Sequence, residues 1–419
     1  MKRVLTAVVL IGFMVLNLGI CLSYAGEIDI LLQKLVDKGV LTPGEAQQIG
    51  TETKEQVKSE IAAGKYSSLP AWVQNTKLKG DFRLRFQNLH EKNTGDISKD
   101  TTIGRIRMRL GLESKVNDKI KVGIGIATGS GDPRSTNITL GGSQAKKTII
   151  LDYAYGKYDP LSWLSFTGGK MLLNDVLWEP TDLIWDTDIT PEGAAIGINK
   201  TLNPKTSVFL TAAPLVIQED TSTTSGAMAY LVQPGINYAI NDNLSLKGAV
   251  TYEYFQTKGT AASSYSKGQN TKIGTSYANN FSNVNPALEL SIKDPFKAVG
   301  LNVENLKFFG EYVNNLAVSN KNSGFSTGFQ FGNAKIEKWG DWQVRYIYAM
   351  LEKDAVLDIL PDSDRYSGKT GIRSHEGILT FGLGKNTNLG IDVYRSWNIV
   401  GTSTKAPETL LQVDWNMKF

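Results

Sequence analysis

Five arginines alternate with apolar residues in two neighbouring stretches of the chain, and they are the best candidates for a chemical role. They are Arg83 and Arg85 in the first stretch and Arg105, Arg107 and Arg109 in the second. Alternate side chains of a strand share one face, so each stretch predicts a row of guanidinium groups opposite an apolar face. Because arginines are costly on a lipid-facing surface, we expect both rows to line a water-filled passage and to select solutes by charge.

Three later arginines occupy similar positions on the polar faces of alternating stretches. They are Arg345, Arg373 and Arg395, and we expect them to extend the basic lining of the same passage. An alternative interpretation is that all of these arginines only pair with carboxylates of the wall and stabilise it.

The segment from Leu172 to Glu192 is acidic, contains no basic residue and is too long for a simple turn. It also contains Trp178 and Trp185, which are unusual in a freely solvated loop. We expect the segment to fold into the passage and narrow it, so that acids of the loop face arginines of the wall across a transverse field. An ordinary surface loop is the alternative. The acids proposed for this constriction are Asp175, Glu179, Asp182, Asp186 and Asp188.

Patterns that could indicate catalysis or a bound metal are weak. The glycine-rich stretch from Gly123 to Gly131 lacks the Lys-Ser/Thr pair of a phosphate-binding loop. The two histidines, His90 and His375, have no activated serine and no paired metal ligand near them in the sequence. We therefore predict no catalytic residue, no metal site and no cofactor, and we do not expect an enzyme.

Strands are the elements that would position these residues, because the hydrophobic period changes to two near Thr76 and stays there. Tight turns such as Asn117-Asp118 and Asp159-Pro160 alternate with long polar loops such as 90–101 and 130–147. We count about 16 strands, within a range of roughly 14 to 18. This pattern predicts an all-β fold, an antiparallel transmembrane barrel with an aqueous interior.

The last expected strand has an apolar row that ends on the final residue of the sequence. Leu411, Val413, Trp415, Met417 and Phe419 share this row. Such an ending resembles the assembly signal of Gram-negative outer-membrane proteins, so the barrel-assembly machinery and outer-membrane lipid are expected partners, and Trp415 and Phe419 are the expected recognition residues.

The chain before the strands divides into two parts. Residues 1–25 combine a basic start, an apolar run and small residues, which predicts a secretory signal peptide and export through the secretory pathway. An uncleaved anchor and a lipid on Cys21 are the alternatives. Residues 26–70 show helical spacing and a capping-box sequence, which predicts a short helical periplasmic segment. Residues 71–419 would form the barrel.

Composition excludes several classes of protein. The formal net charge of +4 gives no indication of nucleic-acid binding. The one cysteine lies in the expected signal peptide, so a disulfide framework is not expected. No run of 18 or more apolar residues follows that segment, so the mature chain is not expected to cross a membrane with helices.

Several stretches together carry a resemblance to a known family. They are Leu31 to Val36 with Gly39 to Thr42, Gly80 to Arg85, Arg105 to Leu112, Gly169 to Met171, Trp185 to Asp188, and Pro191 to Ala195. With these stretches the sequence resembles the putative porin family of Gram-negative bacteria. The resemblance implies a passive outer-membrane channel, and the phosphate-selective porins have a similar layout.

The function expected from the residues and the resemblance is passive diffusion of small hydrophilic solutes and ions, by a channel that packs as a homotrimer. An alternative is a barrel that sheathes haem proteins and carries electrons across the membrane, which a wide lumen without an infolded loop would favour. A membrane-bound hydrolase is a third class, but the two histidines provide little for its chemistry.

Overall fold

The computed structural model describes residues 27–62, 73, 75–92, 98–219, 221, 226–301, 303–400 and 407–419. The expected signal peptide lies outside this part of the chain. Two compact units are present, residues 1–74 and residues 75–419. No helix in the described ranges is long and apolar enough to span a membrane.

Two helices make up the described part of the first unit, as the sequence predicts. They are α2 (Glu27–Asp37) and α3 (Pro43–Ala62). Gly39, just after α2, has a φ of +69°, a conformation that favours glycine and ends a helix. Thr42 and Glu45 form the expected capping box, in which the Thr42 backbone N–H donates to the Glu45 carboxylate at 2.8 Å.

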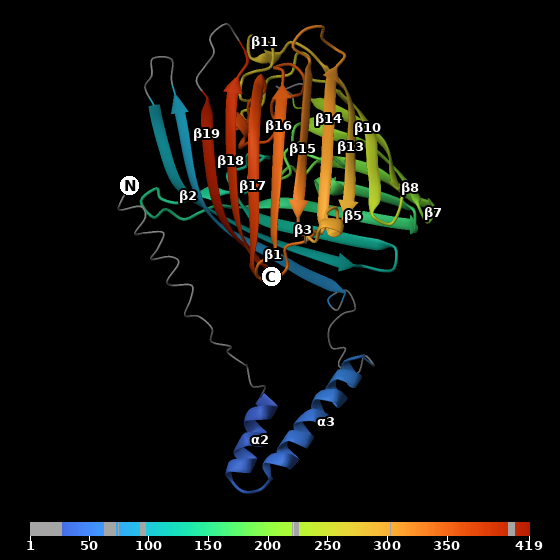
Figure 1. The fold of residues 1–419 in the computed structure, drawn as a ribbon, viewed down its shortest axis with the longest axis vertical. Coiled ribbons are helices and arrows are strands. Elements are labelled where there is room, and N and C mark those ends of the chain that lie inside the picture. The colour runs from blue at the N-terminus through green and yellow to red at the C-terminus, as the bar shows by residue number, and fades with distance from the viewer. Residues whose placement is uncertain are drawn as a thin grey trace. The chain divides into compact units, whose positions relative to one another are not determined.

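The second unit is a closed antiparallel barrel of 16 strands (Figure 1). Each strand pairs with its neighbours in the chain, and β19 pairs back onto β1, where Leu84 lies opposite Trp415. The strands are β1 (Thr76–Lys92), β2 (Ser98–Lys115), β3 (Ile120–Thr128), β5 (Ile149–Leu161), β6 (Leu164–Lys170), β7 (Glu192–Asn203), β8 (Thr206–Gln218), β9 (Ala227–Ala239), β10 (Leu244–Phe255), β13 (Phe281–Lys293), β14 (Asn305–Asn315), β15 (Ser323–Gly332), β16 (Trp342–Leu351), β17 (Ile372–Gly384), β18 (Thr387–Asn398) and β19 (Glu408–Lys418).

Short elements lie in the connections between these strands. β4 (Ile138–Thr139) pairs with β2, and β11 (Lys272–Ile273) pairs with β12 (Ser276–Tyr277). Three 3-10 helices are η2 (Leu173–Asp175), η3 (Lys297–Val299) and η4 (Arg365–Gly368). Figure 1 shows long connections, β11 among them, at the end of the barrel opposite the C-terminus.

The two faces of the wall follow the alternation in the sequence. In β1, Leu84 and Phe86 are 41% and 44% exposed, whereas Arg85 between them is 5% exposed. In β1 the outer face is therefore apolar and the inner face polar, as expected for a barrel surrounded by lipid.

Two predicted connections differ from the structure. Asp159-Pro160 lies inside β5, because a register irregularity between Tyr158 and Leu161 accommodates the proline, and the chain reverses at residues 162–163. The expected loop at residues 90–101 is also mostly strand. His90 pairs with Asp100, so the polar ends of β1 and β2 continue the ladder.

Candidate functional site

The five arginines of β1 and β2 lie together on the inner face of the barrel. Arg83 lies opposite Arg107, and Arg85 lies opposite Arg105. Arg85 and Arg107 are only 5% and 8% exposed. We call these four residues and Arg109 the arginine wall. Cross-strand pairs of like charge repel one another, so the wall requires counter-charges.

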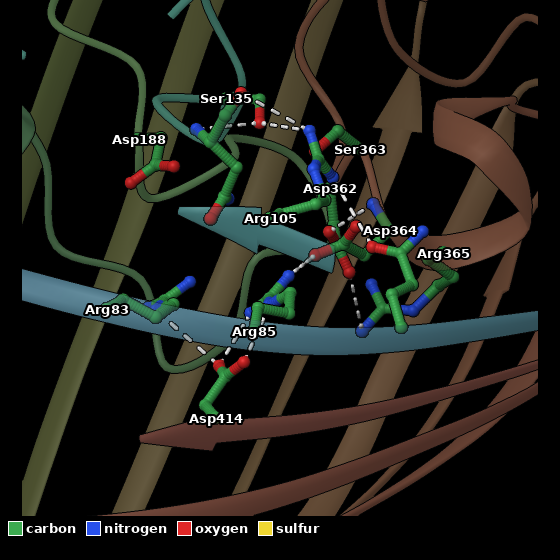
Figure 2. Close-up of polar contacts among 12 residues, drawn as sticks. Arg83, Arg85, Arg105, Ser135, Asp188, Asp362, Ser363, Asp364, Arg365 and Asp414 are labelled. Carbon is green, nitrogen blue, oxygen red and sulfur yellow. Dashed lines mark hydrogen bonds and ion pairs between the residues drawn. The ribbon is translucent and has the colours of Figure 1, made fainter. Parts of the chain in front are cut away.

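Acids of the barrel itself supply part of that charge, and the sequence prediction did not include them. Asp81 lies between Arg107 and Arg109, at 2.9 and 2.8 Å from their guanidinium nitrogens. Asp414 of β19 accepts hydrogen bonds from Arg85 Nε and Nη2 at 2.7 and 2.8 Å, and Figure 2 shows Arg83 directed at the same carboxylate. Asp81 alternates with Arg83 in the sequence, so its place on this face could have been foreseen.

Residues 171–191, here called the first inner loop, lie against the inner wall through an apolar cluster. Leu183, Ile184 and Trp185 are buried in this cluster. The Trp185 indole N–H donates to Glu253 Oε1 of β10 at 2.7 Å. At Trp178 the backbone N–H donates to the Gln233 side chain at 2.9 Å. The tryptophans therefore attach the loop to the wall.

One of the five acids predicted for this loop contacts the arginine wall. Asp188 lies 3.4 Å from Arg109 Nη1. The others have different partners: Asp175 pairs with Lys157 at 2.9 Å, and Asp182 pairs with Arg365 at 3.0 Å.

Two of these acids are buried away from the arginine wall. Asp186 accepts backbone N–H groups of Asp188 and Ser363 at 2.9 and 2.8 Å, and burial raises its pKa well above the ordinary value. Burial, together with nearby Glu311 and Glu253, also raises the pKa of Glu179. A neutral Glu179 avoids the cost of an unpaired buried charge.

A second infolded segment, residues 352–371, was not predicted. We call it the second inner loop. Val356 and Leu357 are fully buried, and the Leu360 carbonyl accepts the Asp186 backbone N–H at 2.7 Å. Asp364 reaches Arg85 Nη1 at 3.1 Å and so supplies an acid to the arginine wall (Figure 2). The sequence signal for this loop was its five apolar residues among residues 355–360, which a solvated loop rarely contains.

Arg134, in the connection between β3 and β5, joins several loops. Its guanidinium is buried and donates to the carbonyls of Tyr265 and Gly368 at 3.0 and 3.1 Å. Ser363 Oγ in turn donates to the Arg134 carbonyl at 3.0 Å. Three connections, after β3, β10 and β16, are therefore held by one side chain.

A cavity of 750 Å³ lies between the arginine wall and the first inner loop. Its lining contains similar numbers of basic and acidic side chains. They are Lys79, Arg109, Lys121, Lys157 and Lys418, and Asp81, Glu113, Asp152, Asp175 and Asp188. The lining therefore presents charges of both signs to a solute.

Two of the arginines expected in the lining face the other way. In β17, Arg373 is exposed while Ile372 and Ser374 on either side are buried. Arg395 of β18 is likewise exposed between buried neighbours. The prediction was wrong for both, because these strand ends carry polar side chains on both faces and alternation alone does not identify the inner one.

Arg345 does face inward, but it contacts a loop. It donates to the Pro180 carbonyl of the first inner loop at 2.6 Å and lies over the Phe309 ring at 4.6 Å. Arg345 therefore attaches the first inner loop to β16 and is not part of the arginine wall.

Three carboxylates, Asp182, Asp362 and Glu376, have oxygens within 4.8 Å of one another. Arg365 Nη2 lies 3.0 Å from Asp182, 3.7 Å from Asp362 and 2.5 Å from Glu376. The guanidinium thus already supplies the positive charge that a metal ion would bring to this cluster.

The sequence from residue 88 to 285 and from 278 to 419 matches the model of the family described as putative porin. The chain belongs to this family. Porins are channels of the bacterial outer membrane and are not enzymes, so the fold, the outer-membrane location and the channel class follow. None of the curated proteins matches the chain in sequence.

The chain is similar to several solved structures. Pseudomonas putida OprB is 13% identical, with 83% of this chain and 95% of OprB covered and a TM-score of 0.54. The outer membrane channel DcaP of Acinetobacter baumannii is 14% identical, with 82% and 97% covered and a TM-score of 0.46. Rhodopseudomonas blastica porin is 11% identical, with 82% and 100% covered and a TM-score of 0.43. At this identity, the similarity to OprB shows the fold alone.

Proposed function

We propose that the chain conducts small hydrophilic solutes and ions by passive diffusion through the barrel interior. The observation that carries this proposal is the arginine wall. Its Arg109 lines the 750 Å³ cavity, and its Arg109 and Arg85 contact Asp188 and Asp364 of the two inner loops. Opposed rows of charge across an aqueous passage orient polar solutes and hinder bare ions.

In this proposal the two inner loops together form the constriction. The first inner loop narrows the passage from the side of β10, where Trp185 attaches it, and the second provides the acid opposite Arg85. Because both loops are held by buried apolar side chains, the constriction is a fixed part of the wall.

Single-channel recording in a planar bilayer under a salt gradient tests this function. The refolded chain should give stable conductance steps. A triple variant, Arg105→Ala with Arg107→Ala and Arg109→Ala, should move the reversal potential toward cation selectivity, because three positive charges leave the wall. An unchanged reversal potential would sink the role of the arginine wall, and absent conductance from a folded barrel would sink the channel.

The alternative function, a sheath around haem proteins, requires a wide interior. Two inner loops packed on the wall through residues such as Trp185 and Leu357 occupy part of that interior and count against the sheath.

Assembly and export complete the proposal. We infer that the chain forms a homotrimer, because wide barrels of this class pack side by side. We also infer that the signal peptide is cleaved after residue 25 and that the Trp415–Phe419 ending directs assembly. In this proposal α2 and α3 lie in the periplasm. Cross-linking in the native membrane would test the trimer, and the N-terminal sequence of the purified protein would test the cleavage.

A further inference from the structure

A basic and aromatic patch lies on the outside of the barrel, near the ends of β17 and β18 that adjoin long loops. It consists of Arg373, His375, Arg395 and Trp397, and we call it the outer basic patch. In the ladder, Arg373 lies opposite Trp397, and His375 lies opposite Arg395. The residues between them, such as Ser374 and Ser396, are buried, so the patch faces away from the lumen.

One indole organises the two guanidinium groups. The Trp397 ring lies 5.3 Å from Arg373 Cζ and 5.8 Å from Arg395 Cζ, measured to the ring centroid. The His375 ring lies 5.8 Å from the same indole, and His375 Nδ1 is 2.6 Å from the Tyr346 hydroxyl. These contacts hold the cationic groups in place on the surface.

The two guanidinium groups have no carboxylate partner among the described residues within 4.0 Å. In contrast, Arg85 and Arg365 inside the barrel each contact at least two acids. The Arg395 Nη1 group donates to the Thr409 hydroxyl at 2.8 Å, which is neutral. These two exposed cations on a membrane-facing surface are therefore available to an external counter-charge.

The position of the patch identifies where that counter-charge lies. Arg373 is the second residue of β17, and Arg395 is three residues from the last residue of β18. Arginine on the lipid face costs about 2–4 kcal/mol at the bilayer midplane but about 0–1 kcal/mol near the interface, where headgroups begin. Long loops of such barrels are extracellular, so the patch lies at the level of the outer-leaflet headgroups.

We propose that the outer basic patch binds the phosphate groups of the phosphorylated glycolipid in the outer leaflet. The planar guanidinium fork matches phosphate oxygens in a bidentate geometry. The ring of Trp397 and that of Tyr348, which lies 5.0 Å from the His375 ring, suit the boundary between headgroup and acyl chain. This inference concerns the outside of the barrel and does not depend on conduction.

Charge complementarity favours a lipid over a second copy of the chain. A second copy would have to present acids, but the outward-facing acids on the described strands are Asp100 and Glu192. Asp100 lies 2.6 Å from His90 Nδ1, and Glu192 lies 2.8 Å from Lys170 Nζ. Each of these two acids therefore already has a partner on a neighbouring strand of its own barrel.

Binding of purified lipid A to the refolded full chain tests the proposal by native mass spectrometry. Dephosphorylated lipid A and phosphatidylglycerol are the comparison lipids. We expect lipid A to bind about tenfold or more tightly than either comparison lipid. The double variant Arg373→Gln with Arg395→Gln should lose this difference, while Arg373→Lys with Arg395→Lys should retain part of it.

Lys200→Gln is the matched control. Lys200 is exposed on the face of β7 that carries the exposed Ile196, at the short-turn end of the strand, and should not affect lipid A binding. Equal loss from this control, full retention by the double glutamine variant, or equal binding of phosphatidylglycerol would each overturn the proposal. The proposal would also be overturned if the double glutamine variant lost an oligomer but bound lipid A as the wild type does. Heat-modifiable gel mobility verifies folding, and single variants replace the double variant if it fails this test.

Discussion

Individual arginines of the inner wall differ in how fully they are neutralised. Arg85 contacts Asp414 from the barrel and Asp364 from the second inner loop. Arg105, in contrast, has polar neutral neighbours, with Ser135 Oγ and the Asn137 carbonyl at 3.4 Å from Nη2. An acid of the second inner loop therefore adds to the charge of Asp414 at Arg85, and its removal should be visible in selectivity.

We predict that Asp364→Asn makes the channel more anion-selective. The substitution leaves Arg85 with Asp414 alone, so the net positive charge of the wall increases by one. The reversal potential under a salt gradient measures the shift. Asp242→Asn, in the exposed turn between β9 and β10, removes the same charge far from the wall and should leave the reversal potential unchanged. Equal shifts in both variants would contradict a local effect of Asp364.

Trp185 tests the attachment of the first inner loop. Trp185→Phe keeps the aromatic packing but removes the N–H donated to buried Glu253, and an unsatisfied buried acceptor costs about 1–3 kcal/mol. We expect more frequent fluctuations in single-channel current as the loop loosens. Trp178→Phe is the control, because Trp178 is attached by its backbone N–H, which the substitution preserves. Quiet current from the Trp185 variant would show that the hydrogen bond is not needed.

Strands were the elements that the sequence predicted best. A period of two is clear in β1 because one face meets lipid and the other carries the arginine wall, so Leu84 and Arg85 necessarily point in opposite directions. The inner loops were only half predicted. Tryptophans marked the first inner loop, whereas the partners of Asp182 and Asp364 lie more than 180 and 270 residues away and depend on how the closed barrel juxtaposes them.

Two glycines position the first inner loop where it leaves the wall. Gly169 of β6 lies opposite Gly193 of β7, with φ values of +119° and +144°. A Cβ on Gly169 would lie 2.3 Å from the Ala154 carbonyl oxygen. Only glycine fits this backbone conformation and this close approach. This explains why one glycine precedes the first inner loop and another follows it.

We predict that Gly169→Ala destabilises the barrel by about 1–3 kcal/mol, the usual cost of a non-glycine residue in such a conformation. Urea unfolding from lipid vesicles measures the free energy. Gly168→Ala is the control, because its Cβ would meet only the Gly193 carbonyl oxygen at 3.9 Å. If both variants unfold at the same urea concentration, the backbone of Gly169 does not require glycine.

The molecule as a whole depends on interlocked loops that contain buried acids. Burial raises the pKa of Asp362 as well as those of Glu179 and Asp186. A folded-state pKa above the unfolded value means that the folded state holds a proton that the unfolded state has released. The stabilising contribution of such a group is therefore complete below about pH 4, near the unfolded pKa of a carboxyl, and decreases as the pH rises above it.

We therefore predict that the inner loops become looser as the pH rises from about 4 toward neutrality, with more current fluctuations at the higher pH. Single-channel recordings at a series of pH values measure this. Glu179→Gln removes one titrating group and keeps its size, so the variant should show a weaker pH dependence. Glu45→Gln, on the exposed start of α3, should behave as the wild type. A pH dependence that is the same in all three proteins would place the titration outside the inner loops, and one that runs in the opposite direction would mean that ionised loop acids hold the constriction together.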